Sequence, residues 1–164
     1  MPDDLKLQAQ ARALAPYLRT LVFTPFLETG SFSPTLVGAT TGGTFTYGTG
    51  NLIEWTRRGD RLSFNGRVSI TATTVAPVGS LSIRGWPYAG VSDSNMAIAG
   101  VGAMIWQNVN LPAGFTSISL QFTNGSITPN LVRSGQNVGL AIVQGGELAG
   151  GVYDFRISGE YRIA

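Results

Sequence analysis

Three aromatic residues, Trp86, Tyr88 and Trp106, stand where the chain leaves expected strands and enters polar loops. A flat ring beside amide and hydroxyl groups suits a sugar, which offers an apolar face and a rim of hydroxyls. The alternative is that these rings cap a hydrophobic core, because large aromatic side chains are usually well buried. On the first interpretation the predicted ligand-binding residues are Trp86, Tyr88, Asp93, Asn95, Trp106 and Asn108.

The residue types present do not indicate catalysis. The chain has no Cys and no His, which excludes thiol nucleophiles, His-based triads, disulfides and most zinc sites. Two carboxylates could form a glycosidase pair, but several acids alternate with apolar residues and are better interpreted as a solvated sheet face. These acids are Glu54, Asp60, Asp93, Glu147, Asp154 and Glu160. We therefore predict no enzyme activity, no catalytic residue, no cofactor and no metal ion, since no calcium-loop signature surrounds Asp93.

Arg58-Gly59-Asp60 spells the tripeptide that integrins recognise. It also stands where a tight turn must lead into a long strand, and Gly-Asp suits such a turn for backbone reasons. We predict a structural turn rather than an adhesive motif, because a match of three residues carries little mechanism.

The composition indicates one globular domain whose partners are neither nucleic acids nor membranes. A chain of 164 residues can bury one full hydrophobic core. Its 11 basic and 9 acidic residues are scattered, whereas a nucleic-acid site needs a clustered basic face. The longest apolar run, Met96 to Trp106, is about half of the ~20 residues that a membrane helix needs. The acidic start at Asp3 and Asp4 lacks a long apolar region, so we expect no signal peptide and synthesis in the cytoplasm.

A long strand from Arg61 to Thr73 is the element expected to position the loops. Throughout this stretch, apolar or small residues fall on one face and polar residues on the other. Because side chains alternate between the two faces of a strand, the pattern predicts one dry face and one solvated face. Such a strand is typical of an antiparallel sheet.

Shorter segments around this strand predict about nine strands in all. We expect them at 35–37, 44–47, 52–57, 61–73, 81–83, 96–106, 115–122, 138–142 and 152–164, with a loop at 127–137. Segment 96–106 is apolar on both faces, so it must be covered twice, inside the domain or at a subunit contact. Many short strands without helical pattern predict an all-β fold, a jelly-roll-like antiparallel β-sandwich over residues 30–164.

Residues 1–29 differ from the rest and are expected to form a short N-terminal helical segment. Apolar residues recur there at the spacing of a coiled-coil seam, at Leu7, Ala11, Leu14, Leu18 and Leu21. Pro16 lies inside this pattern, where it interrupts the helix or begins a second one. The segment either lies on its own domain or associates with copies of itself, and we expect it to serve oligomerisation or attachment.

Several short motifs occur in an order that resembles a recurrent bacteriophage pattern. They are Phe32-Ser33-Pro34-Thr35-Leu36, Gly42-Gly43-Thr44-Phe45-Thr46-Tyr47, Trp55-Thr56-Arg57-Arg58-Gly59-Asp60, Gly85-Trp86-Pro87-Tyr88 and Ser158-Gly159-Glu160-Tyr161-Arg162. Domains with this pattern stand at the ends of phage tail fibres, tail spikes and head fibres. The resemblance covers about residues 31–90 and 152–163. The chain departs from it at Arg58, where the pattern has an apolar residue, and at Trp86, where it has Leu.

The resemblance implies a trimeric β-sandwich head on the virion that touches the host surface. The expected partners are then two further copies of the chain, other virion proteins through residues 1–29, and a host-surface glycan. Two other classes stay open: a virion decoration or connector protein without a receptor role, and a free carbohydrate-binding module. A free module would not need a self-associating N-terminal segment, and a connector should lack polar loops with exposed rings.

Overall fold

The computed structural model describes residues 27–93, 98–148 and 151–164. These residues form β-strands, loops and one short 3-10 turn, η1 (Gly145–Glu147). In chain order the strands are β1 (Leu27–Phe32), β2 (Thr35–Gly38), β3 (Thr44–Tyr47), β4 (Leu52–Arg58), β5 (Arg61–Val75), β6 (Leu81–Arg84), β7 (Ile98–Gln107), β8 (Phe115–Thr123), β9 (Asn130–Gly135), β10 (Val138–Ile142) and β11 (Tyr153–Arg162). Within these ranges no helix is long and apolar enough to cross a membrane.

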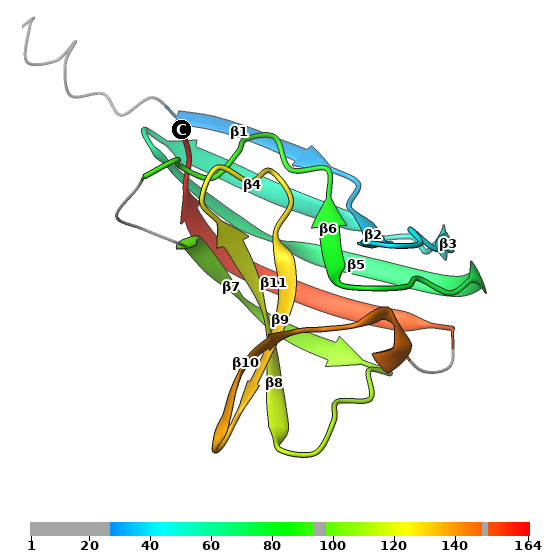
Figure 1. Ribbon diagram of the computed structural model, residues 1–164. Coiled ribbons are helices and arrows are strands. Elements are labelled where there is room, and N and C mark those ends of the chain that lie inside the picture. The colour runs from blue at the N-terminus through cyan, green and yellow to red at the C-terminus, as the bar shows by residue number, and fades with distance from the viewer. Residues whose placement is uncertain (1–26, 94–97, 149–150) are drawn as a thin grey trace, which may run out of the picture.

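The strands belong to one antiparallel sheet that curls over on itself (Figure 1). Their order is β1-β4-β5-β11-β7-β8-β9-β6-β2, and β3 and β10 add to β5 and β9 respectively. The all-β antiparallel class is confirmed. The expected two-sheet jelly roll is not, because hydrogen bonds join the strands into one continuous path, and the natural twist of the sheet makes it wrap around its own concave face.

Two segments fold differently from the sequence-based expectation. Residues 27–29 were assigned to the N-terminal helical segment but begin strand β1, where Leu27 pairs with Arg58 of β4. The helix expected over residues 1–26 lies outside the described residues. Strand β9 occupies the expected loop at 127–137, because its backbone pairs with β8 over most of its length. Pro129 and Gly135 at the ends of this segment suggest a loop. Cross-strand pairing decides whether a segment forms a strand more strongly than its local sequence does.

The long strand β5 is confirmed, and the strands on both of its sides pair with it. Leu62, Phe64, Val68 and Ile70 face the core and are buried. Strand β4 pairs with its first half, and β11 pairs with it from Arg61 to Ile70. Gly66 is required at one close approach, since a Cβ there would lie 2.3 Å from the Leu52 carbonyl oxygen.

Aromatic rings fill the centre of the concave face. The Trp86 ring lies edge-to-face against Phe64 and Phe122, with ring centroids 4.8 and 4.7 Å apart. Phe122 stacks on Tyr161 at 4.0 Å. The indole N–H of Trp86 donates to the Ile83 carbonyl at 3.1 Å, so burying this side chain leaves no unpaired donor. The cluster joins β5, β8 and β11 to the corner that follows β6.

Replacing Trp86 with Ala should lower the free energy of unfolding by about 3–5 kcal/mol, because loss of a buried ring removes contacts and leaves a cavity. Urea denaturation at one fixed protein concentration measures this change. The matched control is Trp106→Ala, which removes a ring that is only partly buried and should cost less. An unchanged unfolding midpoint for Trp86→Ala would contradict its role in the core.

Candidate functional site

Trp86, the first of the predicted ligand-binding residues, has no ring surface to offer a ligand. Its side chain is 3% exposed and lies in the aromatic cluster of the core. The sugar-stacking interpretation is therefore wrong for this ring, and the core-capping alternative holds. The physical reason is that the Gly85-Trp86-Pro87-Tyr88 corner turns Trp86 inward, where Phe64 and Phe122 enclose it.

Tyr88 is half-buried and joins three parts of the fold. Its hydroxyl donates to Glu28 Oε2 of β1 at 2.6 Å, and its ring lies edge-on to Trp55 at 5.7 Å. The Arg57 guanidinium lies over the same ring, 4.8 Å from its centroid. The Tyr88 carbonyl accepts a hydrogen bond of 2.9 Å from the Tyr161 hydroxyl. Burial raises the pKa of Tyr161. These contacts give Tyr88 a structural role at the β1 edge.

The remaining predicted residues do not gather at one place. The Asp93 backbone exchanges two hydrogen bonds with the Asn124 side chain, at 2.7 and 2.6 Å, beside the last residues of β11. Trp106 instead pairs with Phe155 near the start of β11, and Asn108 donates to the Val152 carbonyl at 2.8 Å. The eight residue-to-residue steps from Phe155 to Ile163 span roughly 26 Å of extended strand.

The predicted loop site is thus divided between the two ends of the sheet. Asp93 and Tyr88 belong to one end, and Trp106 and Asn108 to the other. Asn95, the sixth predicted residue, lies outside the described ranges. A single glycan contact through all six residues is not supported by this arrangement.

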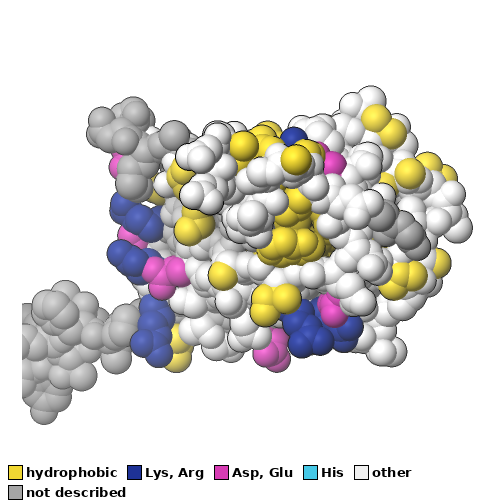
Figure 2. All heavy atoms as spheres, turned by 90° about the horizontal axis from the view of Figure 1, so that it is seen from below, with side chains coloured by type: hydrophobic (Ala, Val, Ile, Leu, Met, Phe, Trp, Pro, Cys, Tyr) yellow, Lys and Arg dark blue, Asp and Glu magenta, His cyan; other side chains and the backbone are white. Residues whose placement is uncertain are grey.

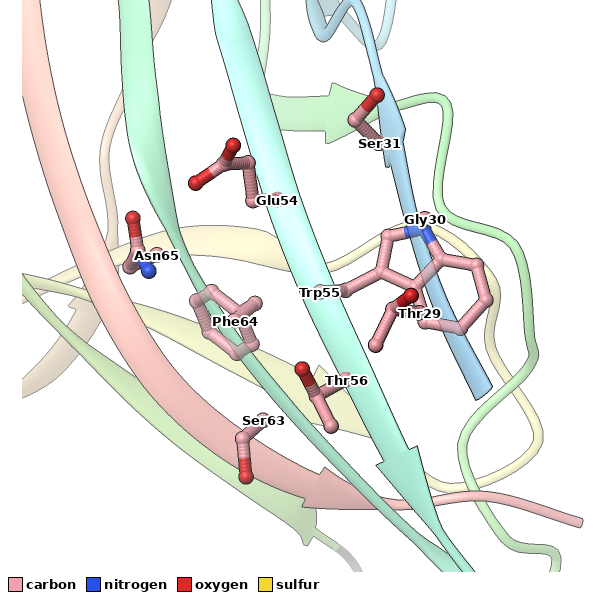
Figure 3. A pocket seen from close by; sticks show the side chains of 9 residues that line it. All are labelled: Thr29, Gly30, Ser31, Glu54, Trp55, Thr56, Ser63, Phe64 and Asn65. Carbon is pink, nitrogen blue, oxygen red and sulfur yellow. The ribbon is translucent and has the colours of Figure 1, made fainter. Parts of the chain in front are cut away.

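The convex face of the sheet carries a hollow that sequence patterns did not single out. Its volume is about 480 Å³. The residues that line it are Thr29, Gly30, Ser31, Glu54, Trp55, Thr56, Ser63, Phe64 and Asn65 (Figure 3). Phe64 belongs to the core and is 5% exposed, and Trp55 is a partly buried ring packed against the core. The other side chains of the lining offer hydroxyls, one amide and one carboxylate. A second hollow of about 420 Å³ shares Asn65 and continues across β11 to β7.

Strand register explains why these side chains lie together. One cross-strand row runs Ser31, Glu54, Asn65, Ser158 and Ala103 on strands β1, β4, β5, β11 and β7. The next row runs Thr29, Thr56, Ser63, Glu160 and Val101 on the same strands. Residues paired directly across strands share a face, and five strands span roughly 19 Å at the usual spacing of ~4.8 Å. We call these rows, with the two hollows, the outer trough.

We call the row of Ser31, Glu54, Asn65, Ser158 and Ala103 the central row. Ion pairs lie on either side of it. On one side Arg61 donates to Glu160 at 2.5 Å, and the Ser63 hydroxyl donates to the other oxygen of Glu160 at 3.2 Å. On the other side Arg67 makes two parallel hydrogen bonds to Asp154, at 2.7 and 3.0 Å. Both hydrogen bonding and charge raise the pKa of the two arginines. Long paired side chains beside short ones leave the middle of the face hollow.

The central row itself keeps its polar groups available. In the described part of the chain, the side chains of Glu54 and Asn65 make no hydrogen bond or ion pair with protein groups. A carboxylate accepts hydrogen bonds only, while an amide both donates and accepts. The row can therefore bind a ligand rich in hydroxyl groups. Across the described ranges, no three Asp or Glu residues gather as they would around a metal ion.

The sequence did contain a signal for the outer trough. Polar residues at every second position of 61–73, and again of 152–164, mark one face of two strands. We interpreted this face as merely solvated. Only the pairing of β5 with β4 and β11 shows that Glu54, Asn65 and Ser158 form one row.

The Arg58-Gly59-Asp60 segment is the turn that the sequence predicted. Arg58 pairs with Arg61, so Gly59 and Asp60 form a two-residue hairpin between β4 and β5. Gly59 has a φ of 61°, and Asp60 does not share this left-handed conformation, which is the pattern of a type II′ turn. The Asp60 carboxylate accepts a hydrogen bond of 3.1 Å from Arg162, and this bond ties the turn to the last strand.

Basic side chains do not form a continuous surface on the face seen from below. Figure 2 shows Lys and Arg side chains there next to Asp and Glu, with hydrophobic side chains gathered in the middle of the view. Phosphate binding needs basic residues clustered on one face, and on this face the basic residues stand beside acidic ones.

Comparisons with known proteins show a likeness in fold. No protein family and no curated protein matches the sequence. Among solved structures, the crystal structure of the Dettilon tailspike protein (gp208) superimposes with a TM-score of 0.60 over 84% of this chain, at 19% sequence identity. The match covers 24% of that tailspike chain, so the present chain corresponds to about a quarter of it. The architecture is thus similar to a phage tail appendage, in agreement with the resemblance of the short motifs.

Proposed function

We propose that this chain is a domain of a phage virion appendage, of the tail-spike or tail-fibre kind, that binds a polysaccharide on the host cell surface through the outer trough. The tailspike likeness supports the virion location. The observation that carries the binding proposal is the row of unpaired polar side chains on four adjacent strands, Ser31, Glu54, Asn65 and Ser158.

The chemistry of the row suits a sugar better than an apolar ligand. Sugar hydroxyls donate to the Glu54 carboxylate, and they both donate to and accept from the Asn65 amide. Hydroxyls of Thr56 and Ser63 lie in the neighbouring row. Because all of these groups stand on paired strands, their spacing is set before the ligand arrives, and little ordering is required on binding.

The surroundings of the acidic residues in the outer trough favour binding of a sugar without its cleavage. A glycosidase pair needs one carboxyl group held in its protonated form. Glu160 instead accepts hydrogen bonds from Arg61 and Ser63, so both of its oxygens are already engaged by protein donors. Glu54, the other acid of the outer trough, has no such arranged partner for proton transfer in the described part of the chain.

Weak binding at each site would be sufficient for attachment. A dissociation constant of ~1 mM corresponds to only about −4 kcal/mol, which a few exposed hydrogen bonds can supply. Several copies on one particle raise the effective affinity by roughly 10²–10⁴ without any new contact. Reversible single contacts would also let a particle sample the cell surface.

Glu54→Gln should reduce attachment of the protein to host cells or host polysaccharide at least several-fold, because it removes the one free carboxylate acceptor of the central row. Asp60→Asn is the matched control: it neutralises an exposed carboxylate in the β4–β5 turn, outside the outer trough, and should leave attachment unchanged. Whole-cell pull-down and circular dichroism measure attachment and folding together.

Variants of the loop residues test whether the glycan contact lies at a sheet end instead. Tyr88→Ala and Trp106→Ala are compared with Glu54→Gln in the same assay. If folded loop variants lose attachment while Glu54→Gln retains it, the glycan contact lies at a sheet end and not on the convex face. If loss follows Asp60→Asn instead, the adhesive interpretation of Arg58-Gly59-Asp60 replaces the structural one.

A homotrimer is the proposed assembly, with other virion proteins bound through the N-terminal segment. It is supported by the 4-3 apolar spacing from Leu7 to Leu21. Light scattering at micromolar concentration should give three times the mass of the 17.3 kDa chain. Removing residues 1–21 should weaken the assembly. A stable monomer of the full chain would contradict this proposal.

A connector or decoration protein without a receptor role is the second candidate, and a free carbohydrate-binding module the third. The exposed polar row is the feature that a pure connector does not need. Electron micrographs of labelled particles separate these classes: label at an appendage tip supports adhesion, label between virion parts supports a connector, and absence of label from particles supports a free module.

A further inference from the structure

The outer trough changes its chemistry along its length. Its β1–β4–β5 part offers hydroxyls, the Glu54 carboxylate and the Asn65 amide. Its other part, which crosses from β5 over β11 to β7, is lined by two arginines and by apolar side chains, because the second hollow contains Arg67, Ala103, Ile105, Arg156 and Ser158. A ligand that fills both parts must match both kinds of surface.

The β11 side carries one positive charge in excess. Arg67 and Arg156 stand opposite each other on β5 and β11, and Asp154 is the acid that contacts both. Asp154 takes two hydrogen bonds from Arg67, whereas its contact with Arg156 is 3.6 Å long. The Arg156 side chain is 67% exposed, so most of its planar set of N–H donors faces solvent. Such a group binds a carboxylate with two parallel hydrogen bonds.

Apolar surface adjoins this cation. Ile105 lies directly across from Arg156 on β7 and is 72% exposed, and Val101 on the same strand is 58% exposed. Ala103 lies between them, opposite Ser158. Exposed aliphatic side chains beside polar ones suit the C–H face of a sugar ring or a methyl-bearing substituent, which gains from leaving water.

We propose that the outer trough binds an acidic oligosaccharide laid across the strands, with its hydroxyl groups at Glu54 and Asn65, its carboxylate at Arg156, and a ring face or methyl substituent on Ala103 and Ile105. This inference rests on the proposed function and adds to it the class of sugar and the direction in which the chain lies. Five strands span roughly 19 Å, enough for several linked sugar rings.

The same surface disfavours the other large polyanion, a nucleic acid. Glu54 and Glu160 lie in the two rows next to the arginines, and a phosphate backbone passing over them would meet repulsion. An oligosaccharide carries its charges at separated positions, so its neutral rings can lie on Glu54 while its carboxylate lies on Arg156. Charge complementarity therefore selects the sugar.

The test uses the full chain and bacterial surface oligosaccharides that contain a uronic acid, each in its native form and in its carboxyl-reduced form. Reduction converts the carboxylate to an alcohol and leaves the sugar chain otherwise the same. Wild-type protein should bind the native forms about five- to tenfold more tightly than the reduced ones, as expected for loss of a charge-assisted contact. The preference should decline with added salt.

Variants locate the contact. Arg156→Gln should remove the preference for the native form and leave binding of the reduced form unchanged, whereas Glu54→Gln should weaken both forms. The matched control is Arg84→Gln, the same change at an exposed arginine of β6 outside the outer trough, and it should alter neither.

Each contrary result has a distinct meaning. Equal binding of native and reduced forms, or equal effects of Arg156→Gln and Arg84→Gln, would overturn the acidic-ligand inference while leaving glycan binding intact. Binding of neither form would overturn both the inference and the proposed function. If Ile105→Ser separates the subunits of an oligomer, the apolar surface of Val101, Ala103 and Ile105 is a contact between copies of the chain, and the inference is wrong.

Discussion

The last strand of the chain, β11, lies between β5 and β7 and holds the sheet together. It pairs with β5 from Tyr153 to Arg162 and with β7 from Asp154 to Tyr161. In the strand order, β11 supplies the backbone pairing between the β1-β4-β5 half and the β7-β8-β9-β6-β2 half. A shift of one residue in this pairing would exchange the two faces of the strand. Phe155, Ile157 and Tyr161 would then leave the core, and Ser158 and Glu160 would leave the convex face.

One register therefore determines both the core and the candidate site. The inward residues of β11 meet Phe64 and Phe122 in the aromatic cluster. Its outward residues complete the cross-strand rows that begin on β1 and β4. Gly159 allows β7 to approach closely, because a Cβ at this position would lie 2.6 Å from the Val101 carbonyl oxygen. A binding surface built in this way is as rigid as the sheet, and it does not depend on the loops.

Alternation along single strands was enough to predict much of the fold. The long strand over 61–73 and the closing strand over 152–164 were both expected from the sequence, and both are present. Strand β9 was missed because Pro129 and Gly135 bound a short segment whose pairing with β8 is invisible locally. The curl of one sheet in place of two was missed for the same reason, since strand order is not written in any local pattern.

The candidate site was harder to predict because it is a property of pairing. Ser31, Glu54, Asn65 and Ser158 are far apart in sequence and become neighbours only through three successive registers. Trp86 shows the opposite difficulty: its position next to a polar loop suggested a surface ring, but the corner at Gly85 turns it inward. Gly85 has a φ of 107°, and a Cβ there would lie 2.7 Å from the Phe32 ring. Composition near a loop does not determine which way a ring points.

The most direct measurement of the central claim is a crystal structure of the full chain with a bound host oligosaccharide. The account predicts sugar density on the convex face, crossing from Glu54 on β4 over Asn65 and Ser158 towards β7. Density at Tyr88 and Asp93, or at Trp106 and Asn108, would contradict it, and so would a convex face covered by another copy of the chain.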